Sequence, residues 1–342
     1  MSRLLEVEGL TVSHASGRIV DDVSFRIERG EALALAGESG CGKTTTALSL
    51  LRLLPPSLTQ TGKITLVPEG AGKAINIGRR TETGMQLVRW RHISLVFQGA
   101  MNSLDPVKKI DHQISEAINL HEDCSSAEVK QRVAELLETV GLTAGLGSRY
   151  AHQLSGGQRQ RVMIALALAC RPSLVIADEP TTALDVVMQA QVLQLLARLR
   201  EELGLALILI SHDLGVLAET CDRIAVMYAG RIVETGPVGA VFSDPQHPYT
   251  KRLLASLPVI GGERGLAPPI PGGPPDPGDP PPGCAFHPRC PYAEDRCRSD
   301  DPALREVGAA HEAACHFAPW SVWPEVAASG GEVVAGGGEG TT

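Results

Sequence analysis

Residues 37–44 constrain the fold of this chain more than any other stretch, because they match the G-x-x-x-x-G-K-[ST] template of a phosphate-binding loop. The loop consists of Gly37, Glu38, Ser39, Gly40, Cys41, Gly42, Lys43 and Thr44. An apolar run at 31–36 is typical of a short buried strand, and leucines at helical spacing follow at 45–54. Glycines let backbone N–H groups face phosphate oxygens, and the start of a helix adds a favourable dipole. The stretch therefore predicts a nucleotide site in which Lys43 reaches the β- and γ-phosphates and the Thr44 hydroxyl holds magnesium.

Composition narrows the class of protein. The 342 residues, 43% hydrophobic and 20% charged, suit one large globular domain with a second, small one. A net charge of -8 provides no general electrostatic footprint for nucleic acid. The longest apolar stretch, 162–170, has about half of the roughly 20 residues that span a bilayer, and the N-terminus lacks a signal-peptide pattern, so we expect any membrane association to be peripheral. Eight cysteines are too sparse for a disulfide scaffold and favour a reducing compartment.

The order of apolar patterns predicts an α/β protein. Alternating apolar and polar positions at 4–29 indicate antiparallel strands. A helical insertion is expected at 125–141, where Ser125 and Glu128 form a capping box and Gly141 is placed to end the helix. Apolar strands at 174–177 and 205–210, with an amphipathic helix near 187–203, then predict a parallel α/β architecture.

A second short segment lies immediately before an apolar helical stretch. Residues 154–158 read Leu-Ser-Gly-Gly-Gln, and Ser155 can cap the following helix in a Ser-x-x-Gln box. Its backbone donors and the positive end of the helix dipole suit a γ-phosphate. Together with the phosphate loop, this segment resembles the ATP-binding cassette (ABC) family. The resemblance implies a P-loop NTPase cassette, with a mixed sheet core, an antiparallel β subdomain and a helical subdomain, in which Ser155, Gly157 and Gln158 close over ATP held by the loop of a partner subunit.

The resemblance extends over residues 4 to about 256 and implies roles for further positions. Asp178, at the end of an apolar strand, matches the magnesium-holding position, and Glu179 matches the residue that polarises the attacking water. His212 matches the switch histidine at the γ-phosphate, and Gln98 matches the glutamine that contacts magnesium or water and the membrane partner. The remaining expected nucleotide or interface contacts are Thr45, Asp185 and His14. His14 is a departure from the family, which places an aromatic residue there to stack on adenine; imidazole offers less stacking area.

Three segments, 99–106, 247–250 and 288–291, resemble the oligopeptide, dipeptide and nickel importer branch of the family. That branch implies an ATP-hydrolysing subunit at the cytoplasmic face of the membrane. Its partners would be two transmembrane permease subunits, a second and usually different ABC ATPase subunit, and a solute-binding protein, with no nucleic acid. A soluble ATPase clamp on nucleic acid or ribosomes is the alternative, but such proteins carry a long coiled-coil insertion or two tandem cassettes. The sequence leaves open the transported solute, the identity of the second ATPase subunit, and whether both ATP sites hydrolyse.

The C-terminal quarter changes character. We expect an ABC domain at 1–256, a Pro/Gly-rich linker at 257–283, a small cysteine-containing module at 284–325 and a disordered tail at 326–342. The module holds Cys284, Cys290, Cys297 and Cys315, separated by five, six and seventeen residues, a spacing that fits zinc poorly. Four thiolates suit an iron–sulfur cluster, and the importer branch implies a [4Fe-4S] cluster in such a tail. Zinc and free structural thiols remain alternatives, and His287, His311 and His316 keep mixed ligation open.

Overall fold

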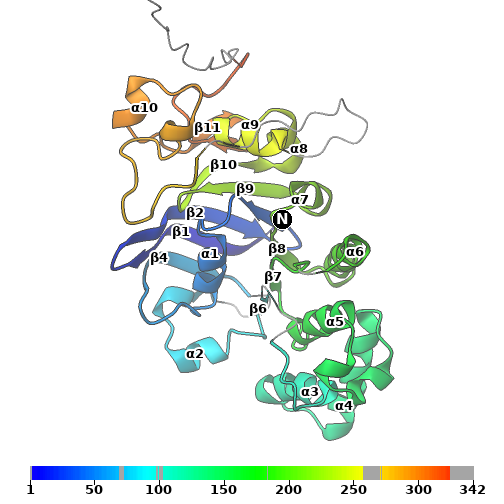
Figure 1. Cartoon of the computed structure of the whole chain (residues 1–342). Coiled ribbons are helices and arrows are strands. Elements are labelled where there is room, and N and C mark those ends of the chain that lie inside the picture. The colour runs from blue at the N-terminus through cyan, green and yellow to red at the C-terminus, as the bar shows by residue number, and fades with distance from the viewer. Residues whose placement is uncertain are drawn as a thin grey trace, which may run out of the picture.

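Two sheets and a group of helices make up the part of the chain that the computed structural model describes: residues 2–68, 73–97, 99, 103–182, 184–256, 270 and 272–323. Among these residues, the first sheet has the strand order β2-β1-β4-β5, and the second has the order β11-β12-β10-β9-β3-β8-β7-β6. Figure 1 shows the first sheet beside helix α1, and helices α3, α4 and α5 grouped below the second sheet. The strands are β1 (Arg3–His14), β2 (Gly17–Glu28), β3 (Ala32–Ala36), β4 (Thr59–Leu66), β5 (Ile75–Asn76), β6 (Ile93–Val96), β7 (Leu174–Asp178), β8 (Ala206–Ile210), β9 (Arg223–Tyr228), β10 (Arg231–Pro237), β11 (Arg305–Gly308) and β12 (His311–Ala313). The α-helices are α1 (Lys43–Leu50), α2 (Glu82–Gln86), α3 (Ile110–His121), α4 (Ser126–Thr139), α5 (Gly156–Ala167), α6 (Val186–Leu203), α7 (Leu214–Thr220), α8 (Val238–Ser243), α9 (Pro248–Ala255) and α10 (Asp295–Ser299).

The antiparallel subdomain follows the alternation in the sequence. Strands β1 and β2 pair antiparallel, with Val7 opposite Phe25 and Leu10 opposite Val23. These apolar side chains are buried in one hydrophobic cluster: Val23 and Phe25 share a face by alternation, and an irregularity in the pairing between Val7 and Leu10 brings both of these side chains into the same cluster. The predicted antiparallel strands at 4–29 are confirmed.

The central strands of the second sheet are parallel and buried on both faces. Strand β3 pairs in parallel with β8 and β9, and β7 pairs in parallel with β6 and β8. All residues of β3, β7 and β8 are buried, as expected for parallel strands covered on both sides. Their carboxyl ends lie at one edge, which is where the polar residues that follow β3, β7 and β8 converge.

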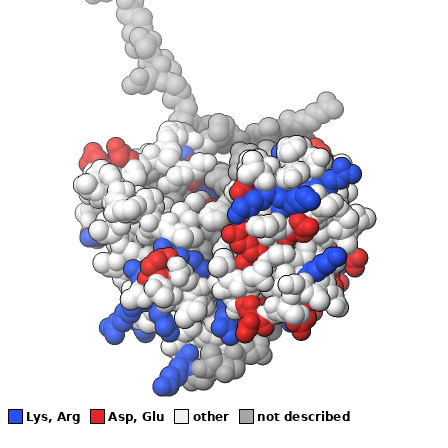
Figure 2. All heavy atoms as spheres, turned by 90° about the horizontal axis from the view of Figure 1, so that it is seen from below, with Lys and Arg blue, Asp and Glu red and all other residues white. Residues whose placement is uncertain are grey.

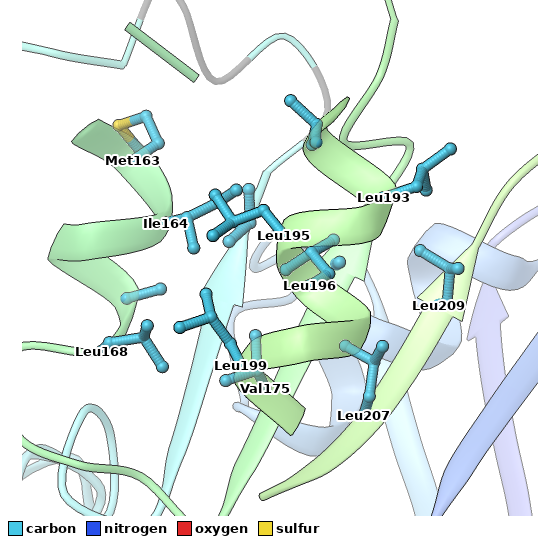
Figure 3. Close-up of a cluster of buried hydrophobic side chains, with 14 of the residues drawn as sticks. Met163, Ile164, Leu168, Val175, Leu193, Leu195, Leu196, Leu199, Leu207 and Leu209 are labelled. Atoms are coloured by element: carbon cyan, nitrogen blue, oxygen red, sulfur yellow. The ribbon is translucent and has the colours of Figure 1, made fainter. Parts of the chain in front are cut away.

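Helices α5 and α6 pack against each other and against this sheet. Figure 3 shows Ile164 of α5 and Leu168, which caps its C-terminus, facing Leu195 and Leu199 of α6, while Leu207 and Leu209 of β8 lie on the other side of α6. Burying one leucine fully contributes about 1.5–3 kcal/mol, so this cluster fixes how α5 sits relative to the sheet. The leucine-rich pattern predicted α6 to within one residue of its start.

Helices α3 and α4 complete the helical subdomain around α5. Helix α4 begins with the predicted capping box: Ser125 Oγ accepts from Glu128 N, and Glu128 Oε2 accepts from Ser125 N at 2.8 Å. After the helix, Gly141 adopts a φ of 74°, which favours glycine. The predicted helical insertion is confirmed.

The C-terminal region does not form the separate cysteine module that we expected. Strand β12 pairs antiparallel with β10, with Glu234 opposite Ala313, so the tail extends the second sheet. Phe286 is 1% exposed and belongs to the main hydrophobic cluster, against which Cys284 and Cys290 also pack. The division at residues 256 and 283 stays a prediction; residues 257–269 of the expected linker and the tail at 326–342 lie outside the described residues.

Candidate functional site

The phosphate loop joins β3 to α1, as predicted, and its shape depends on glycine. A Cβ at Gly37 would lie 2.2 Å from the Met227 carbonyl oxygen, and φ is 143° there. Gly42 has a φ of 102°, and a Cβ there would lie 2.8 Å from the Ile19 carbonyl oxygen. Around Gly40, by contrast, a Cβ would meet nothing within 4 Å. The loop is therefore packed on its inner side and open at Gly40, an arrangement that suits an approaching anion.

Lys43 points into the loop that contains it. Its Nζ donates to the carbonyl oxygens of Gly37, at 2.7 Å, and Glu38, at 2.8 Å, and the side chain is buried. Both acceptors belong to the loop, so the ammonium group is held where phosphate oxygens would meet the backbone N–H groups. Thr44 follows it and is exposed.

Thr44 and Asp178 make a pair of oxygen donors that fits magnesium. Burial raises the pKa of the Asp178 carboxyl, and the neighbouring Thr44 hydroxyl partly offsets this effect by favouring the charged form. Oδ1 of Asp178 is buried and has no hydrogen-bond partner within the described part of the chain. A buried acceptor without a donor is costly, and a hard cation with oxygen ligands would satisfy it. The residues present fit Mg²⁺.

Glu179 follows directly on β7 and turns away from the strand direction. Its φ is 46°, an uncommon value for a residue other than glycine, and its N–H donates to the Ile210 carbonyl oxygen at 2.9 Å. The Thr182 hydroxyl donates to Glu179 Oε2 at 2.9 Å, and His212 Nδ1 lies 4.0 Å from Glu179 Oε1. The structure thus brings together the two residues that the sequence assigned to water and to the γ-phosphate.

Further predicted residues lie on β1, on α1 and at the start of α6. His14 is exposed at the end of β1, where its Nδ1 lies 3.0 Å from the Ser16 hydroxyl. Asp185 caps α6, accepting from Met188 N at 2.9 Å. Thr45 is half-buried in the first turn of α1. Gln98 lies outside the described residues.

The Leu-Ser-Gly-Gly-Gln segment lies at the start of α5. Ser155 Oγ accepts from Gln158 N at 3.3 Å, and Gln158 Oε1 accepts from Ser155 N at 3.0 Å, so the predicted capping box is confirmed. Ser155 is exposed, Gln158 half-buried and Gly157 buried. Figure 1 shows α1 and α5 apart, with β6 and β7 between them. The segment and the phosphate loop thus belong to separate parts of the cassette.

Two residues that carried no role in the sequence interpretation touch the phosphate loop. The Tyr249 hydroxyl accepts from the Glu38 N–H at 2.8 Å. Arg289 donates twice to the Glu38 carboxylate, at 2.7 Å and 2.9 Å. Tyr249 and Arg289 lie in the segments 247–250 and 288–291, and the resemblance of these segments to the importer branch is the sequence signal that points to them.

The predicted iron–sulfur cluster is wrong. Within the described residues, which include all four tail cysteines, no group of three or more His, Cys, Asp or Glu side chains could hold a metal ion. The cysteines behave instead as small apolar residues: Cys315 packs with Ala313 and Ala318 in a cluster of its own. Burial raises the pKa of Cys284 to about 11 and of Cys290 to about 12, as is usual for thiols packed among apolar side chains. The absence of a ligand group within the described residues also counts against the zinc alternative.

Comparison with known families identifies this arrangement. A model described as "ABC transporter" matches residues 20–182, and one described as "Oligopeptide/dipeptide transporter, C-terminal region" matches residues 233–297. The chain belongs to the ABC transporter family. The expected ATP-binding cassette and its ATPase class are confirmed.

Individual relatives agree with the family match. The chain is 41% identical over 321 residues to the dipeptide transport ATP-binding protein DppD of Escherichia coli, covering 92% of this chain and 96% of the relative. It is 45% identical over 312 residues to the oligopeptide transport ATP-binding protein AppD of Bacillus subtilis, covering 89% and 93%. Among solved structures, it resembles a dimeric post-hydrolysis ATP-binding cassette bound to ADP and phosphate, with a TM-score of 0.59, 27% identity, and coverage of 69% of this chain and 99% of that one. No helix within the described ranges has both the length and the apolar composition to cross a membrane.

Proposed function

We propose that this ABC ATPase is the ATP-hydrolysing subunit of an importer for oligopeptides or dipeptides. The observation that carries the ATPase part is the meeting of Lys43, Asp178 and Glu179 at the carboxyl edge of the sheet, with one Asp178 oxygen buried and unpaired. The similarity of residues 233–297 to the C-terminal region of oligopeptide and dipeptide transporters supports the class of solute.

The site residues act mainly by position and charge. The loop at 37–45 and Lys43 would hold the phosphates of ATP, and Thr44 and Asp178, with Gln98, would hold Mg²⁺, which neutralises developing charge on the phosphates. Glu179 would orient the attacking water, and His212, which lies within 4.0 Å of Glu179, would contact the γ-phosphate. His14 would lie near adenine.

Each site would be completed by a second ATPase subunit. Ser155, Gly157 and Gln158 belong to α5, which lies apart from α1 and its phosphate loop (Figure 1), so they would close over ATP bound to the partner, with Asp185 in the interface between the two. Two permease subunits would place the ATPase pair at the cytoplasmic face of the membrane, and a solute-binding protein would deliver the peptide.

The clamp alternative is less well supported. A nucleic-acid clamp needs a continuous basic surface. On the face shown in Figure 2, Lys and Arg atoms lie in separate groups with Asp and Glu atoms between them. Co-purification from detergent with two permease subunits would favour the importer, and co-purification with nucleic acid or ribosomes would overturn it.

Two substitutions separate binding from hydrolysis. We expect Glu179→Gln to bind ATP with near-normal affinity but to lose at least about 100-fold in turnover, because an amide keeps the acceptor for Thr182 but is a poor base. Lys43→Ala should weaken nucleotide binding itself, as measured by equilibrium titration. Near-normal ATPase activity of Glu179→Gln would refute the role of Glu179.

A further inference from the structure

The C-terminal tail is fixed to the phosphate loop by a buried contact. The Arg289 side chain is 7% exposed, and its two donors bind both oxygens of Glu38. Bidentate pairs of this kind are among the stronger hydrogen bonds in proteins. Tyr249 binds the backbone of the same loop residue. The part of the tail next to Arg289 therefore has a defined position relative to the loop.

A proline-rich strap, residues 272–283, runs from this anchor across the turn between β1 and β2. At its start, a Cβ at Gly272 would lie 3.9 Å from Arg289 Cγ. In the middle of the strap, Pro277 and Gly278 lie against Ser16 and Gly17 of the hairpin. A Cβ added at Gly17 would lie 2.0 Å from the Pro277 carbonyl oxygen, and one added at Gly278 would lie 2.8 Å from the Ser16 carbonyl oxygen. Asp276 Oδ1 accepts from Gly278 N at 2.8 Å and closes a turn there. Strap and hairpin are thus in direct backbone contact, and the prolines stiffen the strap.

A cavity of about 410 Å³ lies between the strap, the hairpin and the phosphate loop. Its lining includes Gly40 and Cys41 of the loop, Ile19 of β2, and Pro274, Pro277 and Pro281 of the strap. The volume falls within the roughly 300–1,000 Å³ typical of small-molecule sites. The cavity adjoins the loop that would hold the phosphates, so the rest of a nucleotide has room beside it.

The chemistry of the lining suits a nucleoside better than a second phosphate. Arg18 and Arg231 also line the cavity, but both pair with Asp21, and Arg231 pairs with Asp301 as well. These cations are already neutralised by carboxylates. Proline rings and the Ile19 side chain offer flat apolar surface, against which a heteroaromatic base can pack.

We propose that the proline-rich strap forms the outer wall of the nucleoside half of the ATP site, so that base and ribose lie between Ile19 and the strap prolines. This inference rests on the proposed function, since it requires ATP phosphates on the loop at 37–44. It assigns a nucleotide-contacting role to the tail.

Photo-crosslinking tests the contact on the unaltered chain. The full-length protein is irradiated with 8-azido-ATP and Mg²⁺, with and without excess ATP, and labelled peptides are mapped by mass spectrometry. We expect ATP-protected label within residues 272–283. Protected label confined to the hairpin and the loop, with none in the strap, would overturn the proposal.

A matched pair of glycine substitutions tests the energetic contribution. Gly278→Ala cannot keep its contact with Ser16, whereas a Cβ at Gly273, in the same strap, would meet nothing within 4 Å. We expect Gly278→Ala to raise the Kd for ATP about three- to tenfold while leaving the Kd for inorganic tripolyphosphate unchanged, and Gly273→Ala to change neither. Tripolyphosphate occupies the loop but has no nucleoside, so it separates the two halves of the site.

Comparison of the two ligands separates the strap proposal from the proposed function. Equal ATP affinity in Gly278→Ala and the wild type, or equal weakening of ATP and tripolyphosphate, would overturn the strap as a nucleoside wall while leaving the loop assignment intact. Failure of the wild-type chain to bind either compound would instead refute the proposed function.

Discussion

At the scale of single residues, the Arg289–Glu38 ion pair joins positions 251 residues apart and links the tail to the phosphate loop, with the Arg289 side chain buried. Removing one partner of a buried pair costs about 3–5 kcal/mol, and we expect somewhat less here, about 2–3 kcal/mol, because the Glu38 side chain is 26% exposed. Arg289→Met should therefore lower the urea midpoint of unfolding.

Arg296 provides the control for this prediction. Its side chain is 62% exposed, and it lies 3.8 Å from Asp300. Exposed pairs contribute about 0–1 kcal/mol, so Arg296→Met should leave the midpoint almost unchanged. If both substitutions shift the midpoint equally, the tail is not held by this pair.

The residues of the site differ in how far sequence could predict them. Asp178 ends a strand, and Lys43 and Glu179 follow strands in sequence, so the apolar pattern indicated one edge of the sheet for all three. The partners of Glu38 could not be found this way, because a contact made by folding the tail back leaves no periodic signal. The unpaired oxygen of Asp178 likewise became visible only once the packing around β7 was known.

At the scale of elements, α4 and α5 begin with the same capping box, which allows structure and function to be separated. Ser125 caps α4 and Ser155 caps α5, each with a reciprocal bond from the residue three positions on. We expect Ser125→Ala and Ser155→Ala to destabilise the chain by a similar amount, about 1 kcal/mol. Only Ser155→Ala should also lower ATPase activity, because only α5 would face a partner's nucleotide.

Thermal unfolding and steady-state ATPase assays on both variants test this prediction. Parallel losses of stability with an ATPase decrease in Ser155→Ala alone are expected. Equal ATPase decreases in the two variants would mean that Ser155 acts through helix stability only.

Helix α9 carries a pH-sensitive cap. His247 is buried, its Nδ1 accepts from Tyr249 N at 3.1 Å, and burial lowers its pKa from 6.5 to about 3. Below pH 6.5 this histidine binds a proton in the unfolded chain but stays neutral in the folded chain. The free energy of unfolding therefore has its full contribution from His247 above pH 6.5 and falls by up to about 1.4 kcal/mol for each pH unit towards pH 3.

The variant His247→Asn should keep an oxygen acceptor at the cap but not titrate. Urea unfolding between pH 4.5 and 7.5 should therefore show a smaller loss of stability with falling pH than the wild type. The exposed His112, replaced in the same way, is the control and should leave the wild-type slope intact. An unchanged slope in His247→Asn would contradict the burial argument.

Elements were predicted well where they are long and periodic, and poorly where tertiary pairing creates them. Helices α4 and α6 and the strands up to β3 follow directly from apolar spacing and caps. Strand β12 has only three residues and exists because β10 offers it an edge. The metal module predicted from the cysteine spacing was wrong for a similar reason. Cys284 and Cys290 pack against a hydrophobic core built by residues far away in the sequence, and cysteine spacing does not reveal such packing.

At the scale of the whole molecule, the phosphate loop and the capping segment, residues 154–158, lie apart in Figure 1, so we expect one chain to hold two halves of different sites. Complementation between variants follows from this geometry. The variant Lys43→Ala has a phosphate loop without its lysine but an intact segment at 154–158. The variant Ser155→Arg has an intact loop, but a bulky charged side chain replaces the exposed Ser155 of that segment. Each variant alone should hydrolyse ATP very slowly.

An equal mixture of the two should regain activity. With random pairing of identical subunits and independent sites, half of the dimers are mixed, and each mixed dimer holds one intact loop facing one intact capping segment, so the mixture should reach about a quarter of wild-type activity. Activity measured against total concentration should rise more steeply than linearly at low concentration, since pairing precedes hydrolysis. A mixture as inactive as its components, under conditions where the wild-type chain alone hydrolyses ATP, would show that the capping segment does not complete a partner's site.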